Sequence, residues 1–397
     1  MNDRILIAGG GIGGLTAAIA LRKCGAEVVV LERQPVVAPA GAGITIQANA
    51  HAILDALGVM IPTEDASPLG SFRMVNSKNQ VLMRGDAGNV DIATPSINVH
   101  RADLHRALDS AAEALCIERR LGCEVVEATQ HGDKVEVKLN NGHKETGDLL
   151  IGADGVRSRT RKSLLGEEAM HFRSSRQTCW RFALEAPDLM KEETIENWAP
   201  GRRAGIVPLS RGRLYVYLVM SDWWNPDAAR ENSSAFLQQE FGGISKALDE
   251  VLERVDPKLT LHADELAEQP HIHFGTDRIL LIGDAAHAMT PNLGQGAGMA
   301  IEDAATLALI YAELQNHPER IAAELTKQRM TRVKKVQKTS WRIGQIAHTK
   351  NPVLRTVRDW LLQRMSTAAT EKQATSLWGP GLELGERVRV ELVNVAK

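Results

Sequence analysis

The fold is decided by the stretch Arg4-Ile5-Leu6-Ile7-Ala8-Gly9-Gly10-Gly11-Ile12-Gly13-Gly14. Its apolar first part is typical of a short buried parallel strand, and its glycines match the pattern GxGxxG through Gly9, Gly11 and Gly14. Apolar residues at helical spacing follow up to Gly25, and a second apolar strand then ends in Glu32. This order of strand, glycine-rich turn, helix and strand predicts a Rossmann-like unit that binds a dinucleotide.

The residues of this unit each have a mechanical role. Gly9 makes the tight turn, Gly11 lets a pyrophosphate approach the backbone, and Gly14 lets the helix pack on the strand. The N-terminus of the helix offers free N–H groups and the positive end of its dipole to a phosphate. Glu32 is expected to accept hydrogen bonds from the ribose hydroxyls of an adenosine. The pattern alone leaves open whether the dinucleotide is NAD or FAD.

Bulk properties narrow the class of protein. The chain has 397 residues, a formal net charge of −2, 44% hydrophobic and 24% charged residues, which is typical of a soluble globular protein with one large or two closely joined domains. A net charge near zero gives no electrostatic reason to expect a nucleic-acid partner. The four cysteines are scattered without a CxxC pair, so we expect reduced thiols in a cytoplasmic protein and no metal site. No apolar run reaches the roughly 18 residues that a membrane span needs, so no integral membrane segment is expected.

Two later strands are predicted to end in aspartate. An apolar strand runs into Gly152-Ala153-Asp154-Gly155, and another runs into Gly283-Asp284-Ala285-Ala286-His287. A strand-end aspartate followed by small residues offers an acceptor for hydroxyl groups and leaves room for a polyol. A helix is predicted from about residue 301 to 314, with Glu302 and Asp303 in its first turn.

With these motifs in this order, the sequence resembles the class A flavoprotein monooxygenases, the p-hydroxybenzoate hydroxylase-like family, over nearly the whole chain. The resemblance implies an α/β fold with a Rossmann-like FAD-binding domain of the glutathione reductase-2 type, an inserted, mainly antiparallel β-sheet domain for the substrate, and a helical C-terminal region. The expected boundaries are 1–75, 98–176 and 272–320 for the FAD-binding domain, 76–97 and 177–271 for the substrate domain, and 321–397 for the C-terminal region.

The resemblance also implies the cofactors, which are FAD, NADPH or NADH as co-substrate, and O₂. It places the FAD pyrophosphate at the glycine-rich turn, a ribityl hydroxyl at Asp284 and the FAD phosphate region near Arg101. The turn Gly294-Gln295-Gly296 opens a helix, so its free N–H groups are expected to face the flavin pyrimidine ring and to stabilise negative charge there. The predicted cofactor-binding residues are Gly9, Gly11, Ile12, Gly13, Gly14, Glu32, Arg33, Gly43, Gln47, Arg101, Asp154, Asp284, Pro291, Gly294, Gln295, Gly296 and Ala297.

The middle segment, from about residue 178 to 271, is predicted to form strands that line the substrate pocket. The predicted catalytic residues are Tyr215, Arg203 and Pro291, and further pocket candidates are Trp180, Arg181 and Tyr217. Tyr215 is expected to take a proton from the substrate or to relay one. The alternatives are that Tyr215 and Tyr217 serve only the sheet and that Arg203 lies at the surface. By the family resemblance, a proline at position 291 lies against flavin and substrate. The resemblance also implies that His287 is a structural part of the flavin loop rather than a catalytic base.

A narrower resemblance concerns the substrate. The blocks Gln177 to Arg181 and Gly283 to Gly296 resemble 2-alkyl-4-quinolone 3-monooxygenases and aurachin C monooxygenases. The resemblance implies hydroxylation of an aromatic or N-heteroaromatic ring through a C4a-hydroperoxyflavin, with a small aromatic substrate as the partner. Hydroxylases of salicylate, 6-hydroxynicotinate or urate remain alternatives, as does a non-hydroxylating flavin oxidoreductase. The expected state is a monomer or a homodimer.

The last part of the chain is predicted to be helical up to about Arg364 and a loose tail beyond Ser366. It contains a basic stretch, which we interpret as a solvated helix face; contact with anionic lipid or with the phosphate of NADPH is the alternative. The stretch consists of Lys327, Arg329, Arg332, Lys334, Lys335 and Lys338.

Overall fold

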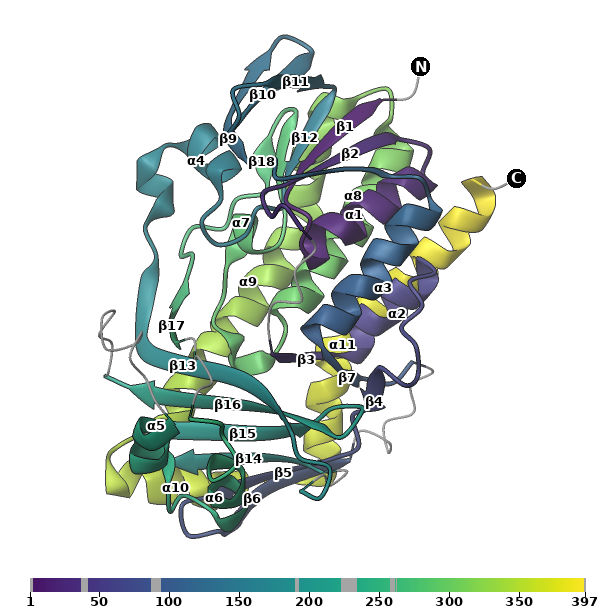
Figure 1. Cartoon of the computed structure of the whole chain (residues 1–397). Helices are drawn as coiled ribbons and strands as arrows, with labels where there is room; N and C mark the ends of the chain where they lie inside the picture. The colour runs from purple at the N-terminus through teal and green to yellow at the C-terminus, as the bar shows by residue number, and fades with distance from the viewer. Residues whose placement is uncertain are drawn as a thin grey trace.

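The computed structural model describes residues 3–36, 42–86, 94–189, 193–222, 234–257, 261 and 263–395. Figure 1 shows the nucleotide-binding half at the top, a large β-sheet at the bottom and long helices that run between the two. No helix among these residues is long and apolar enough to cross a bilayer.

A six-stranded sheet is the centre of the nucleotide-binding half. Its central strands are parallel, as the glycine-rich motif predicts, and Leu6 of β1 stands opposite Val29 of β2 and Leu150 of β12. β18 pairs antiparallel with β19 at one edge. The order of strands is β18 (Gly275–Thr276), β19 (Ile279–Leu281), β12 (Leu149–Gly152), β1 (Arg4–Ala8), β2 (Glu27–Glu32) and β8 (Glu118–Leu121).

The side chains of β1 alternate between two layers because successive residues of a strand point to opposite faces. Ile5 and Ile7 pack into one core with α1 (Ile12–Lys23), α3 (Arg101–Ala114) and α8 (Gly296–Leu314). Leu6 and Ala8 pack into a second core with a three-stranded antiparallel sheet. That sheet contains β9 (Val125–His131), β10 (Lys134–Leu139) and β11 (Lys144–Gly147). The predicted Rossmann-like fold is confirmed.

The large sheet has seven strands, and all neighbours pair antiparallel except β14 with β5. Two of its strands begin at Ser71 and Arg173, a few residues before the boundaries at 76 and 177 expected for the substrate domain. The order is β17 (Ala263–Glu268), β13 (Arg173–Glu185), β16 (Arg213–Ser221), β15 (Arg202–Pro208), β14 (Thr194–Ala199), β5 (Ser71–Asn76) and β6 (Val81–Asp86).

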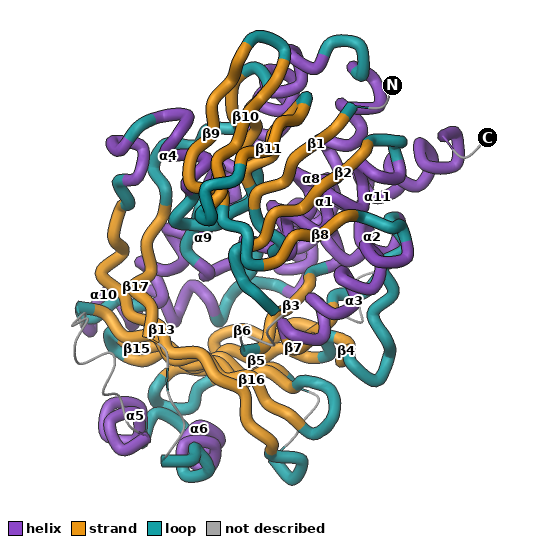
Figure 2. The backbone as a smooth tube through the Cα atoms, turned by 45° about the horizontal axis from the view of Figure 1, so that its top comes forward, coloured by secondary structure: helices purple, strands orange, loops and turns teal. Residues whose placement is uncertain are grey.

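The two faces of this sheet have different neighbours. Helices α5 (Ser234–Phe241) and α6 (Lys246–Leu252) cover one face, as Figure 2 shows below the sheet. Trp180 lies fully buried on that face, so its predicted place in the substrate pocket is wrong. The strand alternation puts Arg181, Arg203, Tyr215 and Tyr217 on the opposite face, toward the nucleotide-binding half.

A small sheet and the C-terminal helices join the two halves. The small sheet has the order β3 (Gly43–Ile46), β7 (Ile97–His100) and β4 (Ala66–Pro68). The C-terminal region contains η5 (Pro318–Arg320), α9 (Ile321–Ala347), α10 (Pro352–Leu362) and α11 (Thr367–Val395).

The predicted loose tail beyond Ser366 is wrong, because α11 packs along α2 (Ala48–Ala56). Glycines permit this close contact: a Cβ added at Gly381 would lie 2.5 Å from Cβ of Asn49, and one added at Gly385 would lie 3.1 Å from the backbone of Ala52. Gly381 and Gly385 therefore bring α11 close to α2, while Leu384 and Val388 of α11 pack into the main core.

Candidate active site

The glycine-rich turn has the geometry that its sequence predicts. Gly9 has φ of +104°, and a Cβ added there would lie 2.5 Å from the carbonyl oxygen of Ala153. A Cβ added at Gly14 would lie 2.0 Å from the oxygen of Gly9, whereas nothing lies within 4 Å of the corresponding position at Gly11. Gly9 and Gly14 are therefore fixed by packing, and Gly11 leaves its backbone open to a ligand.

The first turn of α1 can receive a phosphate. The helix starts at Ile12, and no side chain caps its N–H groups, including that of Gly13. Four N–H groups of a helix start lack an intrahelical partner, so an uncapped start is a ready anion site. This arrangement fits the pyrophosphate of FAD.

Glu32 closes the turn from the end of β2. Its carboxylate accepts hydrogen bonds from the N–H of Gly10 at 2.6 Å and of Gln34 at 2.8 Å. Carboxylate oxygens each have two lone pairs, so Glu32 can still accept a bond from a ribose hydroxyl. Arg33 is the exposed residue that follows it. The ribose contact of Glu32 and a cofactor contact of Arg33 stay predictions.

Asp154 braces a second turn. It accepts hydrogen bonds from the hydroxyls of Ser158 at 2.5 Å and Thr160 at 3.0 Å, where α4 (Arg159–Leu165) begins. Burial raises the pKa of Asp154, although the bonds from Ser158 and Thr160 lower it. Its predicted contact with FAD stays a prediction, and its bonds within this turn account for its position.

Asp284 opens the short helix α7 (Asp284–His287) after a glycine with φ of +57°. Its side chain is exposed to solvent, yet desolvation by surrounding protein raises its pKa, while the charges of His287, Arg101 and Arg181 lower it. Such a carboxylate, open to solvent on one side and enclosed by protein on the others, is suited to accept a hydrogen bond from a polyol hydroxyl. Arg101, the exposed first residue of α3, lies near enough for its charge to act on this group.

The loop before α8 is held by amide side chains. Gln295 donates to Gln47 at 2.5 Å and to Asn49 at 3.1 Å, and Gln47 donates to the carbonyl of Leu293 at 2.7 Å. Trp378 of α11 also donates to Gln47, at 2.8 Å. Sequence reasoning missed Trp378, because only the packing of α11 brings it to this loop.

The start of α8 offers a second set of free donors. The helix begins at Gly296, before the predicted residue 301, and no side chain caps it at Gln295. Gly294 has φ of +63°, and no atom lies within 4 Å of a Cβ added at Gly296. The N–H groups of Gly296 and Ala297 are therefore suited to face a flavin ring, as predicted.

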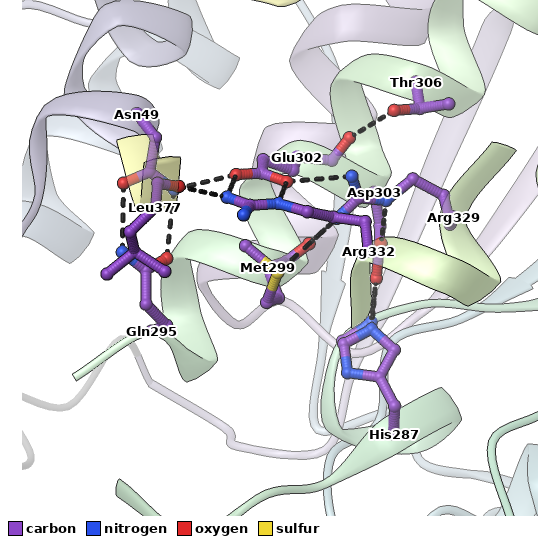
Figure 3. A network of polar contacts seen from close by, with 11 residues as sticks. Asn49, His287, Gln295, Met299, Glu302, Asp303, Thr306, Arg329, Arg332 and Leu377 are labelled. Atoms are coloured by element: carbon purple, nitrogen blue, oxygen red, sulfur yellow. Dashed lines mark hydrogen bonds and ion pairs between the residues drawn. The ribbon is translucent and has the colours of Figure 1, made fainter. Parts of the chain in front are cut away.

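A buried ionic network, the helix cluster, lies behind this loop (Figure 3). It consists of His287, Glu302, Asp303, Arg329 and Arg332. Arg329 contacts Glu302 and Asp303 at 2.8 Å each, and Arg332 contacts Glu302 at 2.9 Å. The prediction of a solvated basic face is therefore wrong for Arg329 and Arg332.

The helix cluster also fixes the loop of α7. His287 lies 2.5 Å from Asp303, whose other oxygen contacts Arg329, so its structural interpretation agrees with the geometry. Desolvation would raise the pKa of Asp303, but the charges of His287 and Arg329 outweigh it and lower that pKa to about 2. Glu302 and Asp303 thus serve this network and do not lie in the first helical turn.

A second buried network, the sheet cluster, lies on the face of the large sheet toward the nucleotide-binding half. It consists of Glu196, Trp198, Arg203, Tyr217 and Asn292. Arg203 contacts Glu196 at 2.8 Å and donates to Asn292 at 2.8 Å, while Tyr217 and Trp198 both donate to Glu196. Burial would raise the pKa of Glu196, but the charge of Arg203 outweighs it and lowers that pKa.

Glu196 is the site residue that sequence reasoning missed. It lies in β14, whose residues are all buried, between Ile195 and Asn197. A charged residue in a fully buried strand requires a partner, and this was the available signal. Tyr217 donates to Glu196 within the same sheet, so its place in the substrate pocket stays a prediction, whereas the alternative that puts Arg203 at the surface is wrong.

The structure brings Arg203 to the loop of Pro291, whereas Tyr215 lies against Gly43 of β3. Pro291 is exposed at the start of η4 (Pro291–Leu293), next to Asn292, to which Arg203 is bonded. The ring of Tyr215 is half-buried, with its centroid 5.8 Å from that of Tyr217. Gly43 leaves space for it, since a Cβ added there would lie 2.4 Å from Cβ of Tyr215.

The charge state of Tyr215 follows from its surroundings. Burial raises the pKa of Tyr215. The positive charges of Arg181, Arg101 and Arg203 lower this pKa, but by less than burial raises it. At neutral pH its hydroxyl is therefore protonated and is a hydrogen-bond donor. Direct proton abstraction by Tyr215 would need a further base.

Comparison with known proteins identifies the class. Residues 3–340 match the family described as FAD binding domain, so the chain belongs to this family. It is an FAD-dependent monooxygenase, FAD is its cofactor, and NAD(P)H and O₂ are typical co-substrates of these enzymes.

Individual relatives can then be named. The chain is 32% identical over 371 residues to aurachin C monooxygenase/isomerase of Stigmatella aurantiaca, covering 91% of this chain and 94% of that one. It is 29% identical over 376 residues to 2-heptyl-3-hydroxy-4(1H)-quinolone synthase of Pseudomonas aeruginosa, covering 93% and 96%. The fold is shared with Klebsiella pneumoniae HpxO in complex with FAD and uric acid, with a TM-score of 0.84, 23% identity and coverage of 95% and 96%.

Proposed function

We propose that this enzyme uses NAD(P)H and O₂ to hydroxylate an uncharged N-heteroaromatic ring, with 2-alkyl-4-quinolones as the substrate class. Two relatives support the ring class, since one acts as an aurachin C monooxygenase and the other makes a 3-hydroxy-4-quinolone. The observation that carries the choice of an uncharged ring is the pairing of Arg203 with Glu196.

This pairing bears on the choice between ring substrates. Salicylate and 6-hydroxynicotinate carry a carboxylate. A carboxylate in a buried pocket needs a cation whose charge is not already neutralised by another acid. Arg203 contacts both oxygens of Glu196 and donates to Asn292, so its charge is already neutralised and its guanidinium is held in place. An uncharged ring that offers N–H and C=O groups avoids the cost of placing a second anion beside Glu196.

The protein groups then have separate tasks. Bound FAD supplies hydride acceptance and oxygen activation, which protein side chains do not provide. Tyr215 donates a hydrogen bond to an oxygen on the ring and so orients it. Arg203 ties the sheet to the loop of Pro291, which fixes the distance between the substrate face and the start of α8.

A substrate panel tests this proposal. The holoenzyme is given 2-heptyl-4-quinolone, salicylate, 6-hydroxynicotinate and urate, and substrate-stimulated NAD(P)H oxidation is compared with the hydroxylated product formed. We expect coupled turnover with the quinolone and weak stimulation by the two carboxylates. Coupled turnover with salicylate and none with the quinolone would contradict the proposal.

The variant Glu196→Gln sharpens this test. It keeps the shape of the side chain and removes the charge that neutralises Arg203, so we expect the preference to shift toward the carboxylate substrates. Adding Arg203→Gln to the Glu196→Gln variant should abolish this shift, because the cation is then gone as well. An unchanged ratio of salicylate to quinolone turnover in Glu196→Gln would remove the pairing as the basis of selectivity.

A further inference from the structure

The surface around α10 gathers exposed apolar side chains. Among the described residues, seven of the twelve large apolar side chains that are exposed lie between residues 346 and 365. Single exposed apolar residues are ordinary on a soluble protein, but a contiguous group marks a contact surface. The seven are Ile346, Val353, Leu354, Val357, Trp360, Leu361 and Met365.

The helix is oriented with its polar side toward the protein. Arg358 donates to the carbonyls of Ile346 and Ala347 at 3.2 and 3.0 Å, and its guanidinium lies 5.1 Å from the ring of Trp198. Asp359 accepts a hydrogen bond from Asn76 of β5 at 3.0 Å. A surface helix normally points its apolar stripe at the core. In α10 this arrangement is reversed.

The outward stripe is continuous along the helix. Val353, Val357 and Trp360 are spaced by four and three residues, and Leu354 and Leu361 are spaced by seven. These spacings place all five side chains on one face of the helix. Val353 is 68% exposed and Trp360 is 50% exposed, which leaves the stripe open to solvent along its length. An interfacial helix inserts an apolar face of this kind between lipid headgroups.

The charges beside the stripe are basic at both ends. The segment from Lys338 to Arg364 contains six basic residues and one acidic residue, Asp359, in a chain of net charge −2. Asp359 is already paired with Arg358. Arg364 lies at the C-terminal end with its guanidinium 4.0 Å from the ring of Trp360. Lys350 lies just before the N-terminal end and pairs with Asp222, which also pairs with the exposed Arg176, so this end keeps a net positive charge.

These charges distinguish between possible occupants. If two copies of α10 packed together, parallel or antiparallel, a basic end of one would face a basic end of the other. An anionic lipid surface matches both the apolar stripe and its basic ends. We propose that α10 binds peripherally to anionic lipid bilayers, with its outward stripe in the headgroup region.

Vesicle co-sedimentation of the full-length holoenzyme tests the proposal. We expect binding to vesicles of phosphatidylcholine with phosphatidylglycerol, at least tenfold weaker binding to phosphatidylcholine alone, and weakening by salt. Leu354→Gln/Leu361→Gln should reduce binding to anionic vesicles at least tenfold. Val353→Gln/Val357→Gln should do the same, which provides an independent pair if the first variant folds poorly.

The control variant is Met60→Gln, which changes a 76% exposed apolar residue outside this surface and should leave binding unchanged. FAD absorbance and the thermal midpoint report whether each variant is folded. Equal binding by the wild type and both double variants would overturn the proposal, as would no binding to anionic vesicles. Sedimentation of the wild type as a dimer that the double variants dissociate, without vesicle binding, would instead assign the stripe to a second copy.

Discussion

The helix cluster and the sheet cluster each contain a buried arginine that pairs with a glutamate, yet they differ in what they connect. In the helix cluster, Arg329 links Glu302 and Asp303 between neighbouring helices of one half. In the sheet cluster, Arg203 links Glu196 of the large sheet to Asn292 of the loop before α8. The first holds the scaffold of the cofactor site together, whereas the second joins the two halves at the proposed substrate face. The function of a buried ion pair thus depends on which elements it joins.

The largest effect is expected from Arg329→Met, which breaks the helix cluster. It leaves two buried carboxylates without their shared cation, and removing one partner of a buried pair costs about 3–5 kcal/mol. Urea unfolding of the holoenzyme measures this loss. Lys334→Met on the exposed side of the same helix is the control and should change the free energy of unfolding by less than about 0.5 kcal/mol. Similar effects of the two variants would contradict the role of the helix cluster.

Acid should affect the two clusters in different pH ranges. His348 is buried beside the sheet cluster, and desolvation, together with the charge of Arg203, lowers its pKa to about 4. Between pH 6.5 and about 4, His348 is protonated in the unfolded chain but still neutral in the folded protein. The contribution of His348 to the free energy of unfolding is therefore full above pH 6.5 and falls as the pH drops. The free energy of unfolding should fall by about 3 kcal/mol over this range, because a shift of one pKa unit corresponds to about 1.36 kcal/mol.

The helix cluster should respond only at lower pH. Asp303 has its pKa lowered to about 2, so its contribution is present above the ordinary value of 3.8 and is lost as the pH falls toward 2. Unfolding measured from pH 7 to 4 in the wild type and in His348→Gln checks the assignment, since the variant should show a shallower decline. Equal slopes would show that His348 does not cause it.

A smaller effect is expected from Arg203→Gln, which breaks the sheet cluster. Hydrogen bonds to charged groups contribute about 1.5–3 kcal/mol, so kcat/KM for the quinolone should fall about 10- to 100-fold while FAD stays bound. The adjacent Arg202 pairs with Glu240 on the other side of the sheet, so Arg202→Gln is the matched control. Loss of FAD together with activity in Arg203→Gln alone would assign Arg203 to the scaffold.

The smallest effect is expected from Tyr215→Phe. Its protonated hydroxyl is proposed to orient the ring with a single hydrogen bond, worth about 1 kcal/mol, so coupled product per NAD(P)H should fall about fivefold. Product yield and NAD(P)H oxidation are measured together, with Tyr217→Phe for comparison. Unchanged coupling in Tyr215→Phe would exclude this residue both as base and as donor.

The sequence predicts the cofactor half well because its signals are local. Gly9, Gly11 and Gly14 have different spatial roles, and all three follow from one turn between a strand and a helix. The alternation of β1 between two cores follows equally from a short apolar strand.

The substrate half depends on contacts between distant segments. Glu196 meets Arg203 and Tyr217 only through the register of β14, β15 and β16. Trp180 was misplaced because alternation along a strand does not tell which face meets the helices. The packing of α11 is hard to predict because Gly381 and Gly385 interrupt the apolar pattern of Leu377, Leu384 and Val388.

The central claim is that this FAD enzyme inserts oxygen into a ring instead of only oxidising NAD(P)H. The direct measurement is turnover of 2-heptyl-4-quinolone under isotopically labelled O₂, with the product analysed by mass spectrometry. The account predicts one labelled oxygen atom in the ring product for each NAD(P)H consumed in coupled turnover. NAD(P)H oxidation that yields only hydrogen peroxide, or a product whose added oxygen comes from water, would contradict it.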